Sequence, residues 1–273
     1  MNGNNKIGDA IVGTKYIEVM SMICVNEIEN VVEVKMRDLS YEKEFRAEIC
    51  DHPCIRFEKM EVEPSKTDLK PGGYISNPTS SYSIGWRGWR INNAGNYTEG
   101  LVTAGHGNRV GDKAETSGGH KFGKFVKRRF GGNLDASFVQ RTSDSFDVSN
   151  TIKFSGSSLK AGYCVTGNLC PKQKVYKVGM KTGLTMGEII SPSCKAYYPE
   201  VDGGSVITFS DYVNANYYSD RGDSGGLVYM DVNGAYVIAG ISVCRGNDSK
   251  PENPNSSFVK ASNIVDQMEI YPY

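Results

Sequence analysis

A serine set among glycines is the feature of this chain that best supports covalent chemistry. Residues 222–226 read Gly-Asp-Ser-Gly-Gly, with Ser224 at the centre. Glycines allow the sharp backbone bend that exposes a nucleophilic hydroxyl. Neighbouring backbone N–H groups can then stabilise the oxyanion of a tetrahedral intermediate. The run therefore predicts acyl transfer with Ser224 as the nucleophile.

The positions of the histidines restrict which triad order applies. The chain has three histidines, His52, His106 and His120, and all of them precede Ser224. The run also satisfies Gly-x-Ser-x-Gly, the nucleophile elbow of α/β-hydrolases, but those enzymes place their histidine after the serine. Two orders with histidine first and serine last remain, and they differ in whether the aspartate precedes or follows the histidine.

His106 is the expected general base. It ends an apolar run, Leu-Val-Thr-Ala-Gly-His-Gly at residues 101–107, which predicts a buried strand that delivers an imidazole at its end. His120 lies in a polar turn and His52 lies far upstream, so we expect both to be ordinary structural or surface residues.

The aspartate that orients this imidazole is expected inside a buried strand. Asp135 interrupts the apolar run at residues 133–139, and a charge there is costly unless it is paired or hydrogen-bonded. As an acceptor for the histidine Nδ1–H it would fix the tautomer and stabilise the imidazolium. Asp112, in a turn, is the weaker candidate.

Together these residues resemble the three signatures of the trypsin-like serine endopeptidases, in the order and spacing of the bacterial streptogrisin and α-lytic branch. Residues 71–76 resemble the mature N-terminal strand of that branch, and residues 175–187 resemble its hairpin before the nucleophile. The resemblance covers residues 71–273. It implies a mainly β fold with two antiparallel six-stranded barrels and a C-terminal helix at 261–270. It also implies an oxyanion hole made by the backbone N–H groups of Gly222 and Ser224.

The sequence departs from this branch at three positions that often carry cysteine, which here hold Gly107, Tyr176 and Met186. Two familiar disulfides are therefore missing. The resemblance further implies that Asp223 turns inward toward a cation, and Lys177 stands at the corresponding place in the hairpin.

The resemblance places the substrate pocket at residues 217–221 and 243–246, with Tyr218, Arg221, Val243 and Arg245 as substrate-binding candidates. Tyr218 stands where trypsin-like pockets carry an aspartate, which argues against a preference for Arg or Lys. Arg221 and Arg245 either favour an acidic substrate side chain or are simply solvated.

The resemblance implies a protein or peptide substrate, and the charge balance gives no sign of a charged polymer as partner. The 273 residues hold 31 basic and 31 acidic side chains, so we expect no nucleic-acid partner and no membrane surface. The one basic cluster, residues 127–129, is expected in a solvated loop. We expect no cofactor.

The seven cysteines leave the redox compartment open. Cys50 and Cys54, and Cys164 and Cys170, are close enough in sequence to staple loops, although spacing alone does not establish a bond. Cys50, His52 and Cys54 have ligand chemistry for zinc, but no fourth ligand is nearby, so we expect no metal.

Three regions are expected along the chain. Residues 1–62 predict a small α+β unit of order ββαβ, with strands at 16–23, 31–36 and 55–62 and a helix at 41–49 capped by Ser40. Residues 63–72 predict a linker, and residues 73–273 the protease domain, with barrels at about 73–145 and 151–273. The first unit resembles the pro-regions of the bacterial relatives, which implies a zymogen-like precursor with its own intramolecular inhibitor or folding aid; the alternative is an unrelated appended domain.

The sequence therefore predicts a serine endopeptidase that works through His106, Asp135, Ser224 and an acyl-enzyme. The rival interpretation is a catalytically silent homologue that acts as a binding or scaffold protein, and a second is an ester or thioester hydrolase. The resemblance implies export, although no apolar signal segment is visible in this chain and a cytoplasmic location stays open.

Overall fold

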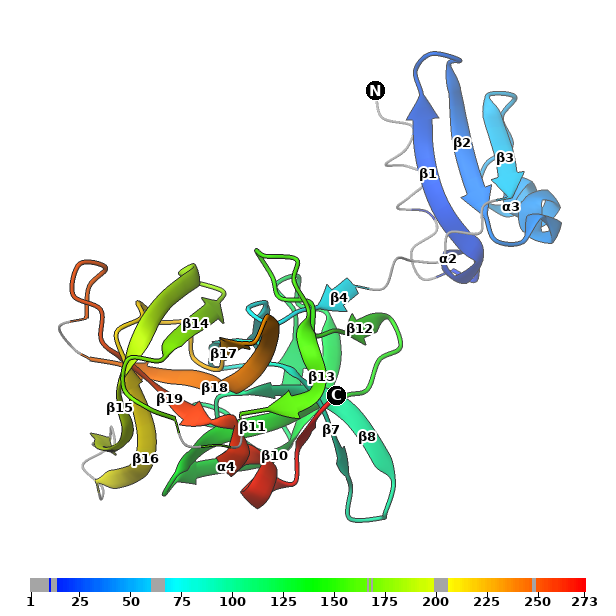
Figure 1. The fold of residues 1–273 in the computed structure, drawn as a ribbon. Helices are drawn as coiled ribbons and strands as arrows, with labels where there is room; N and C mark the ends of the chain where they lie inside the picture. The colour runs from blue at the N-terminus through cyan, green and yellow to red at the C-terminus, as the bar shows by residue number, and fades with distance from the viewer. Residues whose placement is uncertain are drawn as a thin grey trace. The chain divides into compact units, whose positions relative to one another are not determined.

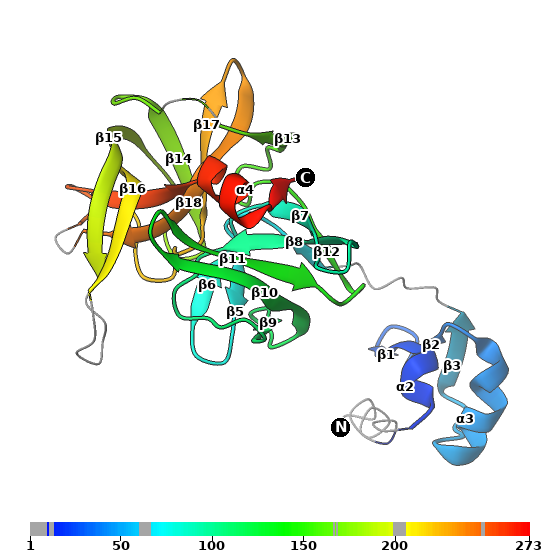
Figure 2. The ribbon, with the colours of Figure 1, turned by 90° about the horizontal axis from the view of Figure 1, so that it is seen from below.

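The computed structural model describes residues 10, 14–59, 67–165, 167, 169–198, 206–246 and 249–273. The chain divides into two compact units, Met1–Ser65 and Lys66–Tyr273. The ribbon views show a small unit in which helices α2 (Tyr16–Val19) and α3 (Glu42–Glu48) accompany a short sheet, and a larger unit built mostly of strands (Figure 1, Figure 2).

The small unit is a three-stranded sheet with a crossover helix. Strand β1 (Met20–Asn26) is antiparallel to β2 (Val31–Met36), and β2 is parallel to β3 (Ile55–Lys59). The connection between the parallel strands runs through η1 (Leu39–Tyr41) and α3 (Glu42–Glu48). This confirms the predicted ββαβ order.

Two local details of this unit differ from the sequence prediction. Residues 16–19 form a short helix, α2 (Tyr16–Val19), rather than the start of a strand. The reason is tertiary, because the Tyr16 ring is buried edge-on against Phe45 and its hydroxyl donates a 2.6 Å hydrogen bond to Glu48. Ser40 does not cap the helix: Asp38 accepts from the Ser40 N–H and caps the preceding turn η1, while α3 begins after Tyr41 without a side-chain cap. The predicted end of the third strand, residues 60–62, lies outside the described residues.

The larger unit begins with a closed barrel. Its strands are β5 (Tyr74–Ser76), β6 (Ser81–Ser83), β7 (Arg87–Ile91), β8 (Tyr97–Thr103), β9 (Lys113–Glu115), β10 (Lys121–Gly131) and β11 (Leu134–Arg141). β6 pairs with β5 and β7 pairs with β8. Between them, Ile84 N–H bonds Gly73 and Gly85 N–H bonds Val102, so residues 81–91 act as one strand and the barrel is six-stranded.

The second barrel closes through a direct strand pairing. It is built of β14 (Lys174–Gly179), β15 (Gly183–Tyr198), β16 (Ile207–Ala215), β17 (Leu227–Val232), β18 (Ala235–Arg245) and β19 (Ser256–Lys260). The order is β18-β17-β14-β15-β16-β19, and β19 pairs back with β18. β13 (Leu159–Cys164) adds to β18 from outside. The predicted second six-stranded barrel is confirmed.

The chain then returns to the first barrel. Helix α4 (Ala261–Met268) follows β19, and β20 (Tyr271–Pro272) pairs with β7. Figure 2 shows α4 lying beside the strands of both barrels. The predicted C-terminal helix is thus present and ends two residues earlier than expected, where Glu269 adopts a left-handed conformation.

Three apolar cores of the larger unit explain its sequence pattern. One draws on first-barrel strands, one on second-barrel strands, and the largest combines side chains of both barrels with α4. On β11, Leu134, Ala136 and Phe138 face the shared core while Val139 faces the first-barrel core. Because β11 is buried on both faces, it reads as a continuous apolar run rather than an alternating one.

Two further expectations about this unit were wrong. Within the predicted linker, β4 (Thr67–Leu69) pairs in parallel with β12 (Phe146–Val148), and Leu69 is buried. The basic cluster at residues 127–129 lies within strand β10 and not in a loop. No helix among the described residues is long and apolar enough to cross a membrane.

Candidate active site

A histidine and an aspartate are hydrogen-bonded to each other where β8 ends, beside the start of β11. His106 Nδ1 lies 2.6 Å from Asp135 Oδ2. The other carboxylate oxygen, Oδ1, accepts hydrogen bonds from the backbone N–H groups of Gly105 (2.7 Å) and His106 (2.8 Å). The Asp135 side chain is only 4% exposed. Both oxygens are therefore committed, and the imidazole is held in the tautomer that presents Nε2 to a reaction partner.

Two opposing charges act on this imidazole. Burial lowers the pKa of His106, while the Asp135 carboxylate raises it by charge and by hydrogen bonding; the Arg128 guanidinium lowers it again. The net pKa is raised. Arg128 is fixed beside the histidine because its Nε donates a 2.6 Å hydrogen bond to the Gly105 carbonyl oxygen. No local sequence pattern indicated this second influence, because Arg128 lies on β10, which is distant from His106 along the chain.

The turn that carries Ser224 packs directly on the strand that leads to His106. A side chain at Gly225 would lie 2.1 Å from Thr103 Oγ1 and 2.6 Å from Ala104 N, so only glycine fits there. The Ser224 carbonyl oxygen accepts a 2.8 Å hydrogen bond from the Ser83 N–H. The described residues include no hydrogen bond between Ser224 Oγ and His106, which is a common state of such pairs before substrate binds.

The backbone around Ser224 offers two unoccupied donors. The Asp223 N–H turns back to the Asp220 carbonyl oxygen at 2.9 Å. Within the described part of the chain, the N–H groups of Gly222 and Ser224 have no hydrogen-bond acceptor. Gly222 has φ +107°, a conformation that L side chains rarely adopt. Among the described residues these two N–H groups are therefore available to an outside acceptor.

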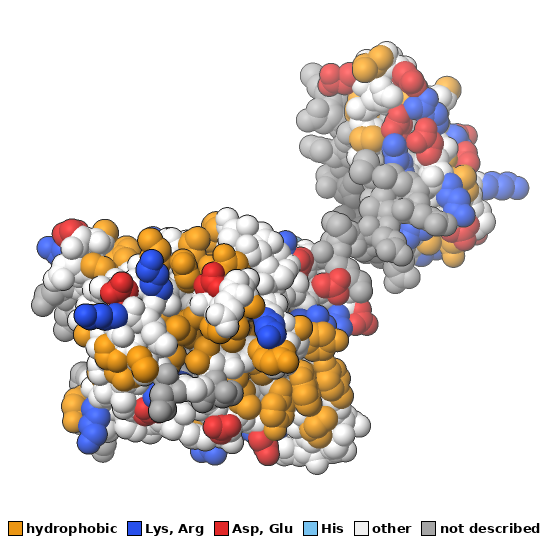
Figure 3. Space-filling model, viewed as in Figure 1, with side chains coloured by type: hydrophobic (Ala, Val, Ile, Leu, Met, Phe, Trp, Pro, Cys, Tyr) orange, Lys and Arg blue, Asp and Glu red, His pale blue; other side chains and the backbone are white. Residues whose placement is uncertain are grey.

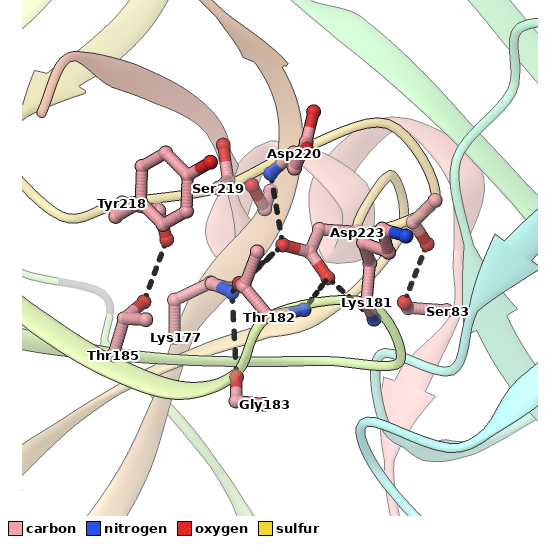
Figure 4. A network of polar contacts seen from close by, with 12 residues as sticks. Ser83, Lys177, Lys181, Thr182, Gly183, Thr185, Tyr218, Ser219, Asp220 and Asp223 are labelled. Carbon is pink, nitrogen blue, oxygen red and sulfur yellow. Dashed lines mark hydrogen bonds and ion pairs between the residues drawn. The ribbon is translucent and has the colours of Figure 1, made fainter. Parts of the chain in front are cut away.

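Asp223 turns inward and meets Lys177, as the resemblance implies. Lys177 Nζ lies 2.9 Å from Asp223 Oδ2, and the two side chains are 0% and 1% exposed (Figure 4). The same carboxylate accepts from the Lys181 and Thr182 N–H groups and from the Thr182 hydroxyl. Burial raises the pKa of Asp223, but the Lys177 charge and these hydrogen bonds outweigh burial and lower it.

Ser83 connects the two barrels at this point, a role that no local pattern indicated. Its hydroxyl donates to the Gly222 carbonyl oxygen at 2.8 Å and accepts from the Met180 N–H at 2.8 Å (Figure 4). Ser83 is fully buried. The serine turn is therefore tied to the first barrel by one side chain as well as by close backbone packing.

The predicted substrate-binding residues lie around the same turn. The Tyr218 carbonyl oxygen accepts from Thr185 Oγ1, and Val243 is buried. Arg245 Nη1 lies 3.5 Å from Asp220 Oδ1, so this arginine already has a carboxylate neighbour. Arg221 is exposed, with its N–H bonded to the Asp220 carboxylate.

Other residues singled out from the sequence have separate environments. Asp112 accepts from the Asn77 side chain and the Arg109 N–H, not from an imidazole. His120 lies in an exposed turn. His52 Nδ1 lies 2.7 Å from Cys54 Sγ in the small unit. Among the described residues, no three His, Cys, Asp or Glu side chains gather as a metal site.

The missing disulfides have a structural counterpart. Tyr176 and Met186, at positions where the resembled branch often has cysteines, lie directly opposite each other on β14 and β15. Tyr176 stacks on Tyr229, with ring centroids 5.2 Å apart. Cys50, Cys54 and Cys164 carry free thiols, so neither of the two sequence-close pairs forms a disulfide. Aromatic packing therefore occupies the place of a cross-link in this hairpin.

Comparison with known proteins agrees with this architecture. The family model described as a Pro-like C-terminal domain matches residues 2–60. A Nocardiopsis protease is 22% identical with a TM-score of 0.60, covering 76% of this chain and 99% of that one. Thermobifida fusca protease A is 18% identical with a TM-score of 0.60, covering 76% and 98%.

A third structure is described as a glutamic acid-specific serine protease that uses a histidine triad in substrate binding. It is 21% identical with a TM-score of 0.61 and covers 75% of this chain and 100% of that one. A search of curated proteins found no match. The larger unit thus has the chymotrypsin fold of bacterial serine proteases.

Proposed function

We propose that this chain is a serine endopeptidase in which Ser224 is the nucleophile, His106 the general base and Asp135 the residue that orients the base. The observation that carries the proposal is that both carboxylate oxygens of Asp135 are hydrogen-bonded. Oδ2 lies 2.6 Å from His106 Nδ1, and Oδ1 accepts from the backbone N–H groups of Gly105 and His106. A protein that had lost its activity would not need this geometry.

The mechanism follows from these positions. Ser224 Oγ attacks the scissile carbonyl carbon while His106 Nε2 takes its proton, and Asp135 stabilises the resulting imidazolium. The oxyanion of the tetrahedral intermediate is received by the N–H groups of Gly222 and Ser224. His106 then donates the proton to the leaving amine, and water repeats the sequence on the acyl-enzyme. Removing one oxyanion donor typically costs about 3 kcal/mol of transition-state stabilisation.

The substrate is a protein or peptide whose side chain before the scissile bond is not basic. Tyr218 occupies the position of the selective aspartate, and Asp220 neutralises Arg245. A histidine triad like that described for the glutamic acid-specific protease has little support, because this chain has three histidines and His106 is the base. Arg221 keeps an acidic preference open to measurement.

The small N-terminal unit is proposed to be a pro-region that inhibits the protease or assists its folding. Support comes from the family match at residues 2–60 and from its ββαβ fold. The chain would then be made as a precursor and act outside the cell.

Labelling with a fluorophosphonate probe tests the proposal. We expect the wild-type chain to be labelled and Ser224→Ala to be unlabelled and inactive on a peptide library. Ser191→Ala is the matched control, because Ser191 lies on β15 outside the candidate site and its hydroxyl donates to the Ser193 carbonyl oxygen. Labelling of Ser224→Ala would refute the assignment. A wild type that stays unlabelled even after it is cut between residues 62 and 73 would favour the silent homologue. Ester cleavage without peptide cleavage would favour the esterase.

A further inference from the structure

An arginine on the first barrel is largely buried, and no described residue offers its charge a partner. Arg90, on β7, is 8% exposed. Its Nε is completely buried and has no hydrogen-bond partner. Within the described part of the chain, no carboxylate forms an ion pair with its guanidinium. Arg90 pairs with Thr98 in the β7–β8 ladder, and its backbone carbonyl oxygen also accepts from the Thr98 hydroxyl at 3.0 Å, but the described residues give its guanidinium no hydrogen bond.

An unpaired buried charge is an unusual state for a folded protein. Removing a guanidinium from water costs free energy that only a counter-charge or good hydrogen bonds can offset. Elsewhere in the same barrel the arginines follow this rule, since Arg87 and Arg141 both pair with Glu99. Among the described residues no group supplies such a counter-charge to Arg90, so an anion from outside the chain is a natural partner for it.

The space for such a partner is present. Arg90 lines a cavity of about 870 Å³ whose wall comes from the β7–β8 hairpin, β10, β11 and the segment after α4. None of the candidate active-site residues lines this cavity. Its remaining lining includes polar side chains that can donate hydrogen bonds, namely Asn92, Asn93 and Gln140.

The cavity wall carries a second cation. Lys127, on β10, lies 3.5 Å from Glu269, a long contact to a carboxylate that is 71% exposed. Such an exposed pair is weak and is readily exchanged for another anion. Two cations against this one acidic side chain leave the lining positive. Figure 3 shows hydrophobic side chains gathered over the neighbouring β7–β8 hairpin; exposed apolar residues there include Ile91 and Tyr97.

We propose that this cavity binds a small oxyanion, a carboxylate or phosphate group, between the Arg90 guanidinium and the Lys127 ammonium. The planar fork of arginine matches two oxygens of either group, and the resulting hydrogen bonds are charge-assisted. The ligand would connect β7 with β10 and the C-terminal segment, which are far apart in sequence.

Calorimetric titration of the full chain tests the site directly. Sodium phosphate and sodium acetate are titrated separately at pH 7.5, with sodium chloride keeping the ionic strength constant. We expect saturable binding of at least one oxyanion, and the tighter of the two identifies the ligand as phosphate or carboxylate. Arg90→Met should weaken that binding at least tenfold, and Lys127→Met by a smaller factor. Arg129→Met, which removes an exposed arginine of β10, should leave binding unchanged.

Thermal unfolding supplies the second readout. In chloride alone, Arg90→Met should unfold at or above the wild-type temperature because it removes an unpaired buried charge. Added phosphate or acetate should raise the unfolding temperature of wild type and not that of Arg90→Met. Absence of saturable binding to wild type would overturn the proposal. Wild-type affinity in Arg90→Met, or in Arg90→Lys if the methionine variant fails to fold, would also overturn it.

Discussion

The hydroxyl of Ser83, from the first barrel, donates a 2.8 Å hydrogen bond to the carbonyl oxygen of Gly222, in the turn of the second barrel that carries Ser224. The same hydroxyl accepts from the Met180 N–H. One buried side chain thus fixes the backbone from which an oxyanion donor projects. The geometry of the proposed active site therefore depends on how the two barrels are joined.

Replacing Ser83 by alanine should impair turnover more than folding. The change leaves the Gly222 carbonyl and the Met180 N–H without their partner, which costs about 1–3 kcal/mol of stability. A small displacement of the oxyanion donors should lower kcat by roughly 10–100-fold. Ser242→Ala is the control, since its buried hydroxyl accepts from the Tyr217 hydroxyl and has no hydrogen bond to Gly222 or Met180 among the described contacts. Equal kcat values for the two variants would contradict this role.

Asp135→Asn should retain the fold and lose about 10⁴-fold in kcat, because an amide favours the wrong imidazole tautomer. Asp112→Asn should lose less than tenfold, since Asp112 bonds Asn77 and the Arg109 backbone. Steady-state kinetics with one peptide substrate measures both. The reverse ranking would transfer the orienting role to Asp112.

The pH dependence of kcat/KM should reveal the charge beside His106. The base must be neutral, so activity rises as pH passes upward through the pKa of His106, which is raised. The positive charge of Arg128 lowers the pKa of His106 and so opposes the effect of Asp135. Arg128→Gln removes a positive charge, stabilises the imidazolium and should shift the rising limb to higher pH. The exposed Arg129→Gln should leave the limb in place. A shift to lower pH in Arg128→Gln would contradict the electrostatic assignment.

Lys177→Met should destabilise the larger unit by about 3–5 kcal/mol, because it leaves the buried Asp223 carboxylate without its cation. Lys260→Met breaks the partly exposed pair with Asp211 and should cost about 1 kcal/mol or less. Denaturant unfolding compares the two. The double variant Lys177→Met with Asp223→Asn should recover part of the lost stability. If Lys177→Met alone loses no more stability than Lys260→Met, the buried ion pair does not stabilise the unit as proposed.

Wild type should be cut between residues 62 and 73 on incubation, while Ser224→Ala should stay intact if the chain cuts itself. The buried Leu69 and the pairing of β4 protect residues 67–69, so we expect the cut before Thr67. Intact-mass measurement over time checks this, together with activity before and after cutting. A wild type that stays full-length and fully active would reject the pro-region proposal, and cutting of both proteins would indicate an outside protease.

Local sequence was sufficient for the elements whose pattern reflects their own neighbours. The apolar run before His106, the buried Asp135 strand and the glycine turn around Ser224 each bear their signal within a few residues. The order of His106 and Ser224 excluded the α/β-hydrolase arrangement without any structure. The resemblance then supplied the barrels, and the pairing of Asp223 with Lys177 followed from it.

The rest depended on contacts between distant segments, which no local pattern encodes. Tyr16 starts a helix because its ring packs on Phe45, and the basic residues 127–129 form a strand because β10 pairs with β9 and β11. Ser83 has no distinguishing local pattern, because the partners of its hydroxyl, Gly222 and Met180, belong to the second barrel. Arg90 has the sequence setting of a surface residue. Only tertiary packing buries its Nε, because burial is decided by what the rest of the chain places around a side chain.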